Sequence, residues 1–370
     1  MYLRPGRGPA IANVNMSQSN DTRGLLSLFQ VPNVLKTILG KFQPAAPPLP
    51  APIRTLFAVN RKFTALQVRP ATLVRSLSHC DPQKMAASKE DFGFVATFHA
   101  PHAVHTTGGL RMDIEDKCPM ALAFSGDGKV VAVAGENTLY VYAEGRLICK
   151  TYVTGITKMK FMQLTDQDSL KTLLVVLTPY GIRVFEVSSE VRPLKSLLHG
   201  HALDVLPLNP FLVVVKNSAT NVTSFVDEDP FAEGAHGASD KLEMRVIQIY
   251  PLHNNVIMMR TSDGLLYTMD LDHRDTRETV TIPGFTAGTK LFVQTHLGFE
   301  VIQVAGKDVH IAIQSGLFLL PLRKVMGFLG NEYLPENLIR LDKTVKDGET
   351  TFYLVFEMPD KKALVFKYVC

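Results

Sequence analysis

Short apolar runs alternate with polar, turn-forming stretches along most of the chain. The clearest runs are residues 130–133, 139–142, 173–177, 211–215, 256–259, 301–304 and 353–356. They are rich in β-branched and aromatic residues, and Gly, Asp, Asn or Pro separates them, as is typical of strands and turns. A continuous run this short fits a strand covered on both faces, whereas a buried helix needs about ten residues or more. The pattern predicts an all-β protein, with room for one short helix at residues 318–330.

The pattern of strands and turns repeats. Similar units begin near Leu122, Met159, Asp204, Val246, Leu291 and Leu338. Their mean spacing of about 43 residues falls within the range of roughly 40–45 residues that four-stranded propeller blades occupy. Residues 92–121 precede the first full unit and supply part or all of a further blade. The repeat therefore predicts a β-propeller of six or seven four-stranded blades.

Four turn phrases resemble the WD40 repeat family. Residues 123–129 (AFSGDGK) resemble the link between its first two strands, and residues 181–186 (GIRVFE) look like its third strand, with Phe-Glu where Trp-Asp is usual. Residues 262–270 resemble the same turn and strand, and residues 198–205 resemble the Gly-His opening. The chain has no Trp, so the His-Ser-Asp-Trp arrangement of the family cannot be completed. The resemblance implies a divergent WD40-like propeller over residues 92–370.

The last unit predicts how such a ring would close. It can be divided into strands at residues 338–341, 351–357 and 363–369, after which the chain stops. A blade of three strands would leave an unpaired edge, which sheets avoid. We expect the missing strand from residues 92–98, or else from residues 110–114. Closure by an N-terminal strand is also what the WD40 resemblance implies.

Charge divides the chain into two unlike parts. Residues 1–84 hold 7 Arg and 4 Lys against 2 Asp, a net charge of +9, and they contain 10 of the 22 prolines. The remaining residues hold 28 basic and 33 acidic side chains, a net charge of −5. Proline resists helix and sheet interiors. The composition predicts a disordered basic extension over residues 1–84 and one globular domain over residues 85–370.

Three interpretations of the extension remain open. Its Arg-rich, acid-poor composition with apolar residues near helical spacing fits a mitochondrial transit peptide. A basic tail could instead contact an acidic partner or an anionic surface. The third interpretation is an unstructured leader that precedes an alternative start at Met85. We expect a cytoplasmic protein, with mitochondrial import as the alternative.

Three histidines form the densest group of candidate metal ligands. His99, His102 and His105 are spaced by three residues, and three histidines can hold zinc. In a strand, His99 and His105 would share a face while His102 points away, and Pro101 opposes a helix. Neither C-x-x-C nor H-E-x-x-H accompanies them. We therefore expect surface or loop histidines, with no metal and no cofactor.

An acidic group marks the longest polar insertion of the domain. Asp227, Glu228 and Asp229, with Glu233, lie in a stretch rich in Pro, Gly and Ala. Carboxylates suit Ca²⁺ or Mg²⁺, but the EF-hand spacing is absent. The pattern predicts a solvated acidic loop over residues 227–241, where a partner protein would make contact.

His201 is the remaining candidate. It could act as a general base oriented by Asp204, but no nucleophile motif accompanies it, and the Gly-His resemblance implies a structural histidine. P-loop, G-x-S-x-G and dinucleotide-binding motifs are absent. The four cysteines fit ordinary thiols, and the acidic domain does not fit a nucleic-acid surface.

These features favour a non-catalytic scaffold that mediates protein–protein interactions as a subunit of a larger complex. One alternative is a metal-dependent propeller enzyme that uses His99, His102 or His105. Another is a traffic-related propeller that regulates a small GTPase. The longest apolar runs are far shorter than the roughly 18 residues of a membrane span, so no transmembrane segment is expected.

Overall fold

The computed structural model describes residues between 64 and 369, with gaps. The described residues are 64–65, 72–77, 85–87, 92–96, 102–106, 111–115, 120–232, 236–252, 255–275, 277–280, 291–294, 301–305, 309–313, 316–320, 337–358 and 362–369. All of them belong to the second of two compact units, residues 46–370.

The first ten strands of the described chain lie between residues 64 and 152, and the last eight of them form two sheets. They are β1 (Thr64–Ala65), β2 (Thr72–Leu77), β3 (Met85–Ala87), β4 (Phe92–Ala96), β5 (His102–Thr106), β6 (Arg111–Ile114), β7 (Ala121–Phe124), β8 (Val130–Ala134), β9 (Thr138–Ala143) and β10 (Arg146–Tyr152). Strands β3–β6 and β7–β10 each form one four-stranded sheet.

The middle of the chain forms three further sheets of the same kind. The first contains β11 (Lys158–Asp166), β12 (Ser169–Thr178), β13 (Gly181–Val187) and β14 (Val191–Leu197). The second contains β15 (Asp204–Leu208), β16 (Phe211–Asn217), β17 (Thr223–Glu228) and β18 (His236–Leu242). The third contains β19 (Val246–Pro251), β20 (Val256–Thr261), β21 (Leu266–Asp270) and β22 (Arg277–Val280).

The two last sheets each recruit a strand from the N-terminal part of the chain. Strand β1 pairs in parallel with β26 in the sheet of β23 (Leu291–Gln294), β24 (Val301–Ala305), β25 (Val309–Ile313) and β26 (Gly316–Leu320). Strand β2 pairs antiparallel with β29 in the sheet of β27 (Leu338–Lys346), β28 (Glu349–Glu357) and β29 (Ala363–Val369).

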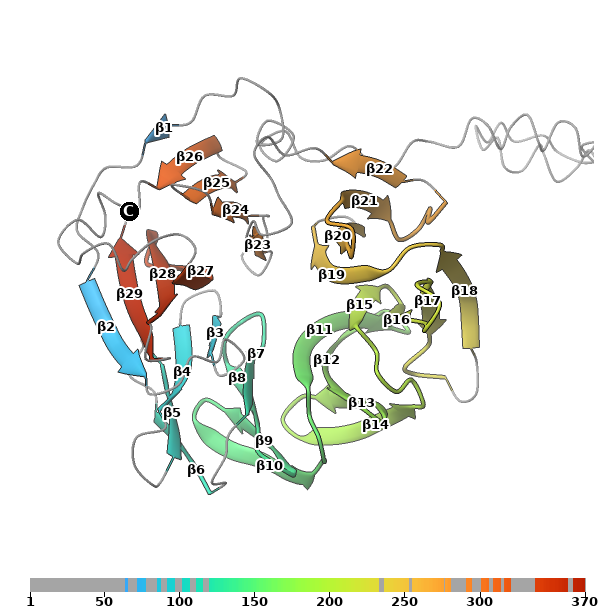
Figure 1. Cartoon of the computed structure of the whole chain (residues 1–370). Helices are drawn as coiled ribbons and strands as arrows, with labels where there is room; N and C mark the ends of the chain where they lie inside the picture. The colour runs from blue at the N-terminus through green and yellow to red at the C-terminus, as the bar shows by residue number, and fades with distance from the viewer. Residues whose placement is uncertain are drawn as a thin grey trace, which may run out of the picture. The chain divides into compact units, whose positions relative to one another are not determined.

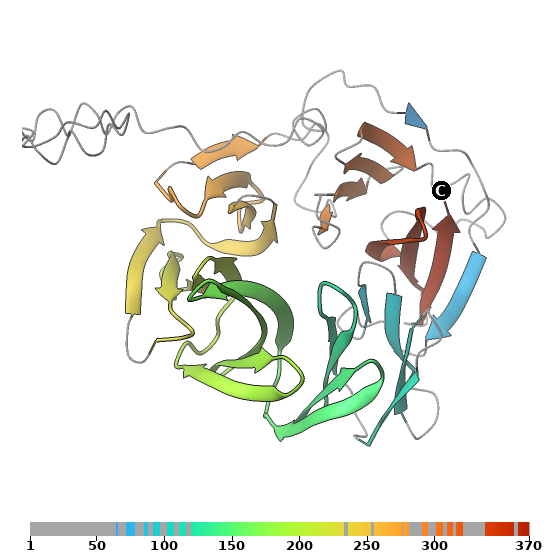
Figure 2. The same cartoon turned by 180° about the vertical axis from the view of Figure 1, so that it is seen from behind.

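The sheets of residues 46–370 form a propeller. Among the described residues there are six four-stranded sheets and one five-stranded sheet, and Figures 1 and 2 show them around a common centre. In each of the seven, the strand nearest the centre begins a meander. Neighbouring inner strands are in contact, as β3 is with β7 and β7 is with β11. The all-β class is confirmed. The six repeat starts expected from the sequence all fall within first strands of these sheets.

Burial falls from the inside of each sheet outward, which explains the apolar runs. In the second strands, the stretches Leu173–Leu177 of β12 and Leu212–Val215 of β16 are buried, with exposed fractions of 2% or less. The fourth strands β10, β14 and β22 carry mostly exposed or half-buried residues. A second strand is covered by sheets on both faces, so both sets of alternating side chains must be apolar.

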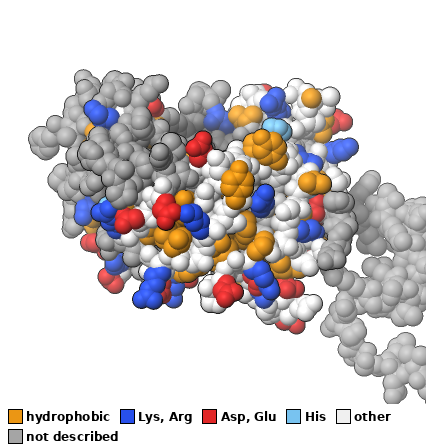
Figure 3. Space-filling model, turned by 90° about the horizontal axis from the view of Figure 1, so that it is seen from below, with side chains coloured by type: hydrophobic (Ala, Val, Ile, Leu, Met, Phe, Trp, Pro, Cys, Tyr) orange, Lys and Arg blue, Asp and Glu red, His pale blue; other side chains and the backbone are white. Residues whose placement is uncertain are grey.

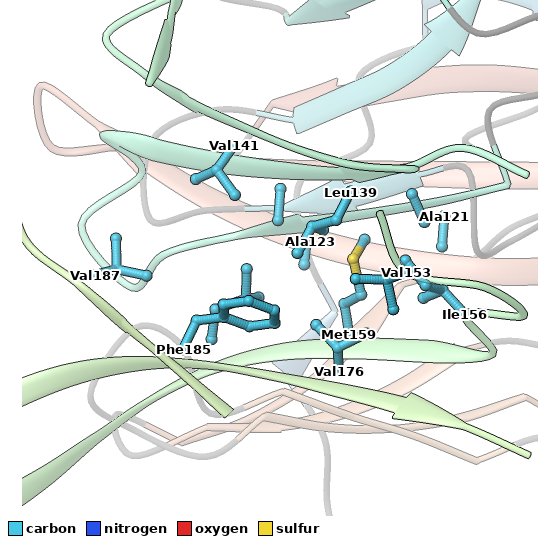
Figure 4. Packing of buried hydrophobic residues seen from close by; sticks show 13 residues of the cluster. Ala121, Ala123, Leu139, Val141, Val153, Ile156, Met159, Val176, Phe185 and Val187 are labelled. Carbon is cyan, nitrogen blue, oxygen red and sulfur yellow. The ribbon is translucent and has the colours of Figure 1, made fainter. Parts of the chain in front are cut away.

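Neighbouring sheets are held together by apolar side chains from their facing surfaces. Figure 4 shows one such cluster, in which small alanines of β7 and β8 meet larger side chains of the next sheet. Phe185 and Met159 fill the space that Ala123 and Ala132 leave. Each large apolar side chain buried in this way contributes about 1.5–3 kcal/mol, so the contacts between sheets are a main source of stability.

Two expectations about the N-terminal part are wrong. Residues 92–96 are strand β4, which lies between β3 and β5 in the first sheet, so they do not complete the last sheet. The partner of β29 is β2, which lies inside the segment expected to be disordered. The boundary at residue 84 is therefore too late in the chain. The basic and Pro-rich composition of residues 1–84 concealed two short strands, β1 and β2, whose pairing partners β26 and β29 are more than 250 residues away in the chain.

The prediction of a short helix at residues 318–330 is wrong for its first three residues. Residues 318–320 belong to strand β26, where Phe318 pairs with Ile311 of β25. The rest of that segment lies outside the described residues. An apolar run this short is compatible with a helix or a strand. Here the run pairs with β25, and this pairing favours the extended conformation.

Candidate interaction surface

Three connecting segments meet at one end of the β11–β14 sheet. They are the link from β10 to β11 at residues 153–157, the turn between β12 and β13 at residues 179–180, and the link from β14 to β15 at residues 198–203. We call the surface formed by Tyr152, the last residue of β10, and by Tyr180 and Leu198 on the second and third segments the Tyr180 surface.

Hydrogen bonds hold the backbone beneath the Tyr180 surface. The Thr178 hydroxyl oxygen accepts hydrogen bonds from the backbone N–H groups of Tyr180 (3.2 Å) and Gly181 (3.1 Å). The same hydroxyl donates to the carbonyl of Gly181 at 2.9 Å. The N–H of His201 donates to the carbonyl of Pro179 at 3.2 Å, which ties the third segment to the turn. The segments are therefore fixed to one another by backbone contacts that do not involve the exposed side chains.

Two glycines permit the close approach of these segments. A Cβ atom at Gly181 would lie 2.5 Å from the carbonyl oxygen of Leu197, and one at Gly200 would lie 2.7 Å from that of Pro179. Both neighbours are backbone atoms that cannot rotate away. Any larger residue at either position would push the link and the turn apart.

The side chains on this rigid backbone are large, apolar and exposed. The exposed fractions are 69% for Tyr152, 77% for Tyr180 and 93% for Leu198. A gathering of hydrophobic side chains beside a histidine and several Lys or Arg side chains is visible on the face that Figure 3 shows. Clustered exposed apolar side chains mark interaction sites, whereas single ones do not. The sequence contained one indication of this surface, because Tyr180 occupies a turn position that small or polar residues usually fill.

Arg183 lies beside the Tyr180 surface. It is an exposed residue of β13, and its Nη1 donates a hydrogen bond to the carbonyl of Tyr152 at 3.2 Å. This bond crosses from the β11–β14 sheet to the end of the preceding sheet. It keeps the guanidinium group next to Tyr152.

A buried ion triad lies under the link that carries Leu198. Asp204, 3% exposed, is bound by Lys158 at 2.7 Å and by Lys160. Burial alone would raise the pKa of Asp204, but the charges of Lys160 and Lys158 outweigh it and hold this pKa below its ordinary value. Burial lowers the pKa of Lys160 despite the opposing charge of Asp204. Asp204 is a structural anion that joins β15 to β11, which argues against the general-base pair with His201.

Two residues of the expected acidic loop, Asp227 and Glu228, belong to a strand and bind side chains of the fold. Asp227 and Glu228 are the last residues of strand β17, and Glu228 is only 1% exposed. Arg274 of the next sheet forms ion pairs with Asp227 and with Asp240, the latter at 3.1 Å. The expectation of a solvated loop is therefore wrong at these positions, because the Arg274 guanidinium pairs with Asp227 and the His199 ring binds the buried Glu228.

Residues of the preceding sheet secure the other side of this segment. The Lys195 ammonium donates to the carbonyls of Asp229 (2.7 Å) and Ala232 (2.9 Å). The Asp229 carboxylate accepts the N–H groups of Phe231 (2.8 Å) and Ala232 (3.2 Å), so it orders its own turn. Glu233 lies outside the described residues. Contact of a partner with this loop stays a prediction.

His199, two residues before the expected histidine, makes the buried side-chain contacts. Its Nε2 bonds Glu228 of β17, and the Lys216 ammonium donates to its Nδ1 at 2.9 Å. Because the ammonium can only donate, Nδ1 accepts and Nε2 carries the proton. His201 itself is exposed and adopts a left-handed backbone with φ of 54°. The hydrogen bond of His201 to the Pro179 carbonyl uses its backbone N–H. The sequence therefore indicated the correct loop, but it did not single out His199, the histidine whose ring makes the buried contacts.

Two of the histidines expected as an alternative metal site belong to one strand. His102 and His105 both lie in β5. His99 lies outside the described residues. Within the described part of the chain, no three His, Cys, Asp or Glu side chains are grouped as metal ligands.

A groove of about 500 Å³ lies between the β7–β10 and β11–β14 sheets, lined in part by the β7–β8 turn. Its lining includes Phe161 and the carboxylates of Asp127 and Glu144. The Asp127 carboxylate accepts hydrogen bonds from the Ser125 hydroxyl (2.6 Å) and the N–H of Lys129 (3.1 Å). Although burial opposes the shift, these bonds and the Lys129 charge lower the pKa of Asp127. This carboxylate stabilises the turn that resembles the first WD40 link.

Comparisons with known proteins add little to this structure. No protein-family model and no curated protein matches the chain. Of the described residues, none forms a helix long and apolar enough to cross a membrane.

Several solved structures are similar at low identity. A crystal structure of BBS1N in complex with ARL6DN has 12% identity and a TM-score of 0.48, and the match covers 81% of this chain and 97% of that one. The WD40 domain of SCAP from fission yeast has 12% identity and a TM-score of 0.45, with 78% and 86% covered. The C-terminal WD40 domain of Sif2 has 11% identity and a TM-score of 0.41, with 81% and 99% covered. These scores are too low to carry an argument; the four-stranded meanders by themselves make the chain a β-propeller, and its Ser125–Asp127 turn resembles the first link of a WD40 repeat.

Proposed function

We propose that the propeller is a non-catalytic scaffold that binds a protein partner through the Tyr180 surface, as a subunit of a larger complex. The observation that carries this proposal is the exposure of Tyr152, Tyr180 and Leu198 on a backbone fixed by hydrogen bonds. A rigid platform loses little conformational entropy on binding. Tyrosine is enriched among the interface residues that contribute most to affinity.

A closed ring of seven blades is part of this proposal. It is supported by the pairing of β2 with β29, which gives the last sheet its fourth strand. Met85 of the first sheet packs with Tyr353, Val355 and Val365 of the last sheet. Arg340 of β27 also donates a hydrogen bond to the carbonyl of Met85. A closed ring would keep the links between blades, and hence the Tyr180 surface, in fixed positions.

The proposal is tested by comparing two exposed positions at opposite ends of β12. Tyr180 follows the end of this strand, and Leu170, which is 65% exposed, lies near its start. We expect Tyr180→Ala to remove at least one protein that co-purifies with the full chain from native extract, while Leu170→Ala retains it. Both variants should melt at the wild-type temperature, because neither side chain is buried.

The outcome that overturns the proposal is equally specific. If quantitative mass spectrometry finds the same set of co-purifying proteins for wild type, Tyr180→Ala and Leu198→Ala, the Tyr180 surface is not the binding site. A loss of partners in Leu170→Ala alone would move the site to the opposite end of the sheet.

A further inference from the structure

We propose that the Tyr180 surface binds a partner segment in which a carboxylate lies next to apolar side chains, and that Arg183 receives this carboxylate. The inference rests on the proposed function and deepens it, because it names the chemistry of the partner.

The first step is the pairing of cations on this part of the propeller. Lys171 and Arg192 both pair with Glu186, and Lys150 pairs with Glu115. Arg183 lies among them on the same two sheets, yet within the described residues no ion pair of Arg183 is recorded. Its recorded hydrogen bond goes to a neutral carbonyl, that of Tyr152. The charge of Arg183 is thus left uncompensated by the described fold.

The second step is the orientation of the guanidinium group. A guanidinium has five N–H donors in a planar fork, and the bond to Tyr152 uses one nitrogen, Nη1. That bond holds the group in place while the residue remains exposed. A positioned fork with free donors fits the two oxygens of a carboxylate.

The third step concerns the surroundings of Arg183. The carboxylate on the adjoining link, Asp204, is buried and already bound by two lysines. The exposed atoms next to Arg183 belong to the end of β10, where Tyr152 is 69% exposed. An ion pair formed beside such aromatic surface is shielded from water when a partner covers it, which strengthens the pair. A basic segment would instead be repelled by Arg183 and by the half-exposed Lys158.

The experiment uses the full chain and a displayed library of random short peptides. Peptides are selected on the wild-type protein, and those that also bind Tyr180→Ala are removed. We expect the remaining peptides to be enriched in Asp or Glu flanked by Leu, Phe or other apolar residues. Their affinities, measured by fluorescence anisotropy, should fall at least about tenfold in Arg183→Glu and should weaken with added salt.

A charge swap provides the matched control. In one enriched peptide, the acidic residue is replaced by Lys, and the substituted peptide should bind Arg183→Glu better than wild type. Arg183→Lys retains the charge and loses the planar fork, so an intermediate affinity is expected. Wild-type affinity of the acidic peptide for Arg183→Glu overturns the inference.

The outcomes separate this inference from the proposed function. If no peptide depends on Tyr180, the Tyr180 surface is not a binding site and both proposals fail. If peptides depend on Tyr180 but are neutral or basic, only the inference about the carboxylate fails. If peptides bind only after residues 1–63 are removed, the N-terminal segment of this chain occupies the surface, and an acidic partner is excluded as its resident ligand.

Discussion

At the scale of single residues, Asp204 connects two neighbouring sheets. Its carboxylate is buried and bound by Lys158 and Lys160 of β11. Removing one partner of a buried ion pair leaves the other charges uncompensated, which costs about 3–5 kcal/mol. Asp204→Asn should therefore lower the free energy of unfolding by roughly that amount in urea titrations.

An exposed carboxylate provides the control for this substitution. Asp168→Asn, in the β11–β12 turn, should change the free energy of unfolding by no more than about 0.5 kcal/mol. Equal losses for the two variants would mean that the triad contributes nothing beyond a surface charge.

The same triad predicts a pH dependence. The pKa of Asp204 is lower in the folded protein than in the unfolded chain. The unfolded state therefore binds the proton first as the pH falls, so stability decreases with falling pH. The contribution of Asp204 should be complete above about pH 4, the ordinary value for aspartate, and should be lost as the pH falls through its folded pKa. Urea titrations between pH 6 and pH 2 should show the wild type and Asp204→Asn converging; a constant difference would contradict the assignment.

Single-residue patterns in the sequence identified the right places more often than the right roles. The acidic group at residues 227–229 was visible, but Glu228 is buried against His199 and Asp227 pairs with Arg274. The His199 ring and the Arg274 guanidinium that bind these carboxylates are 29 and 47 residues away in the chain. A local pattern contains no information about such partners, so it predicted solvation.

At the scale of elements, β2 is the strand whose removal has the clearest consequence. Its residues form five register pairs with β29. Deleting residues 1–70 keeps β2, whereas deleting residues 1–84 removes it and exposes the edge of β29. With about 0.5–1.5 kcal/mol for each lost backbone hydrogen bond, the longer deletion should cost about 2–5 kcal/mol more and should aggregate on heating.

The two truncations are compared in thermal melts. A synthetic peptide that covers residues 70–79, added to the longer deletion, should restore part of the lost melting temperature. If the two truncations melt at the same temperature, β2 does not stabilise the last sheet, and the closed ring proposed above loses its main support.

The strands of the repeating units were easier to predict than β2, the N-terminal strand that completes the last sheet. Second strands such as β12 and β16 are buried on both faces, so their continuous apolar runs were distinctive. Residues 72–77 include Arg75 and Ser76 and lie at the outer edge of a sheet. An edge strand needs few apolar residues, so β2 did not stand out from its basic surroundings.

At the scale of the whole molecule, a basic N-terminal segment precedes an acidic propeller. Residues 1–63 contain 5 Arg and 3 Lys against 1 Asp. We expect these residues, fused to a fluorescent reporter, to leave it in the cytoplasm, because Pro32 interrupts the apolar helical spacing that import requires. Microscopy and an immunoblot for cleavage decide the matter. Mitochondrial accumulation of a shortened fusion would establish the transit peptide instead, and a reporter without the segment is the control.

The sequence by itself determined the all-β class, the period of the repeat and the first strand of six sheets. These features depend on alternation and on apolar runs within about 40 residues of chain, and local patterning expresses them directly. The tertiary structure decided which N-terminal strand completes the last sheet, which histidine is buried, and that Tyr152, Tyr180 and Leu198 come together. Each of these depends on pairing or contact between segments that are distant in the chain. Several segments of similar composition could have satisfied each contact, and only the packing of neighbouring sheets distinguishes between them.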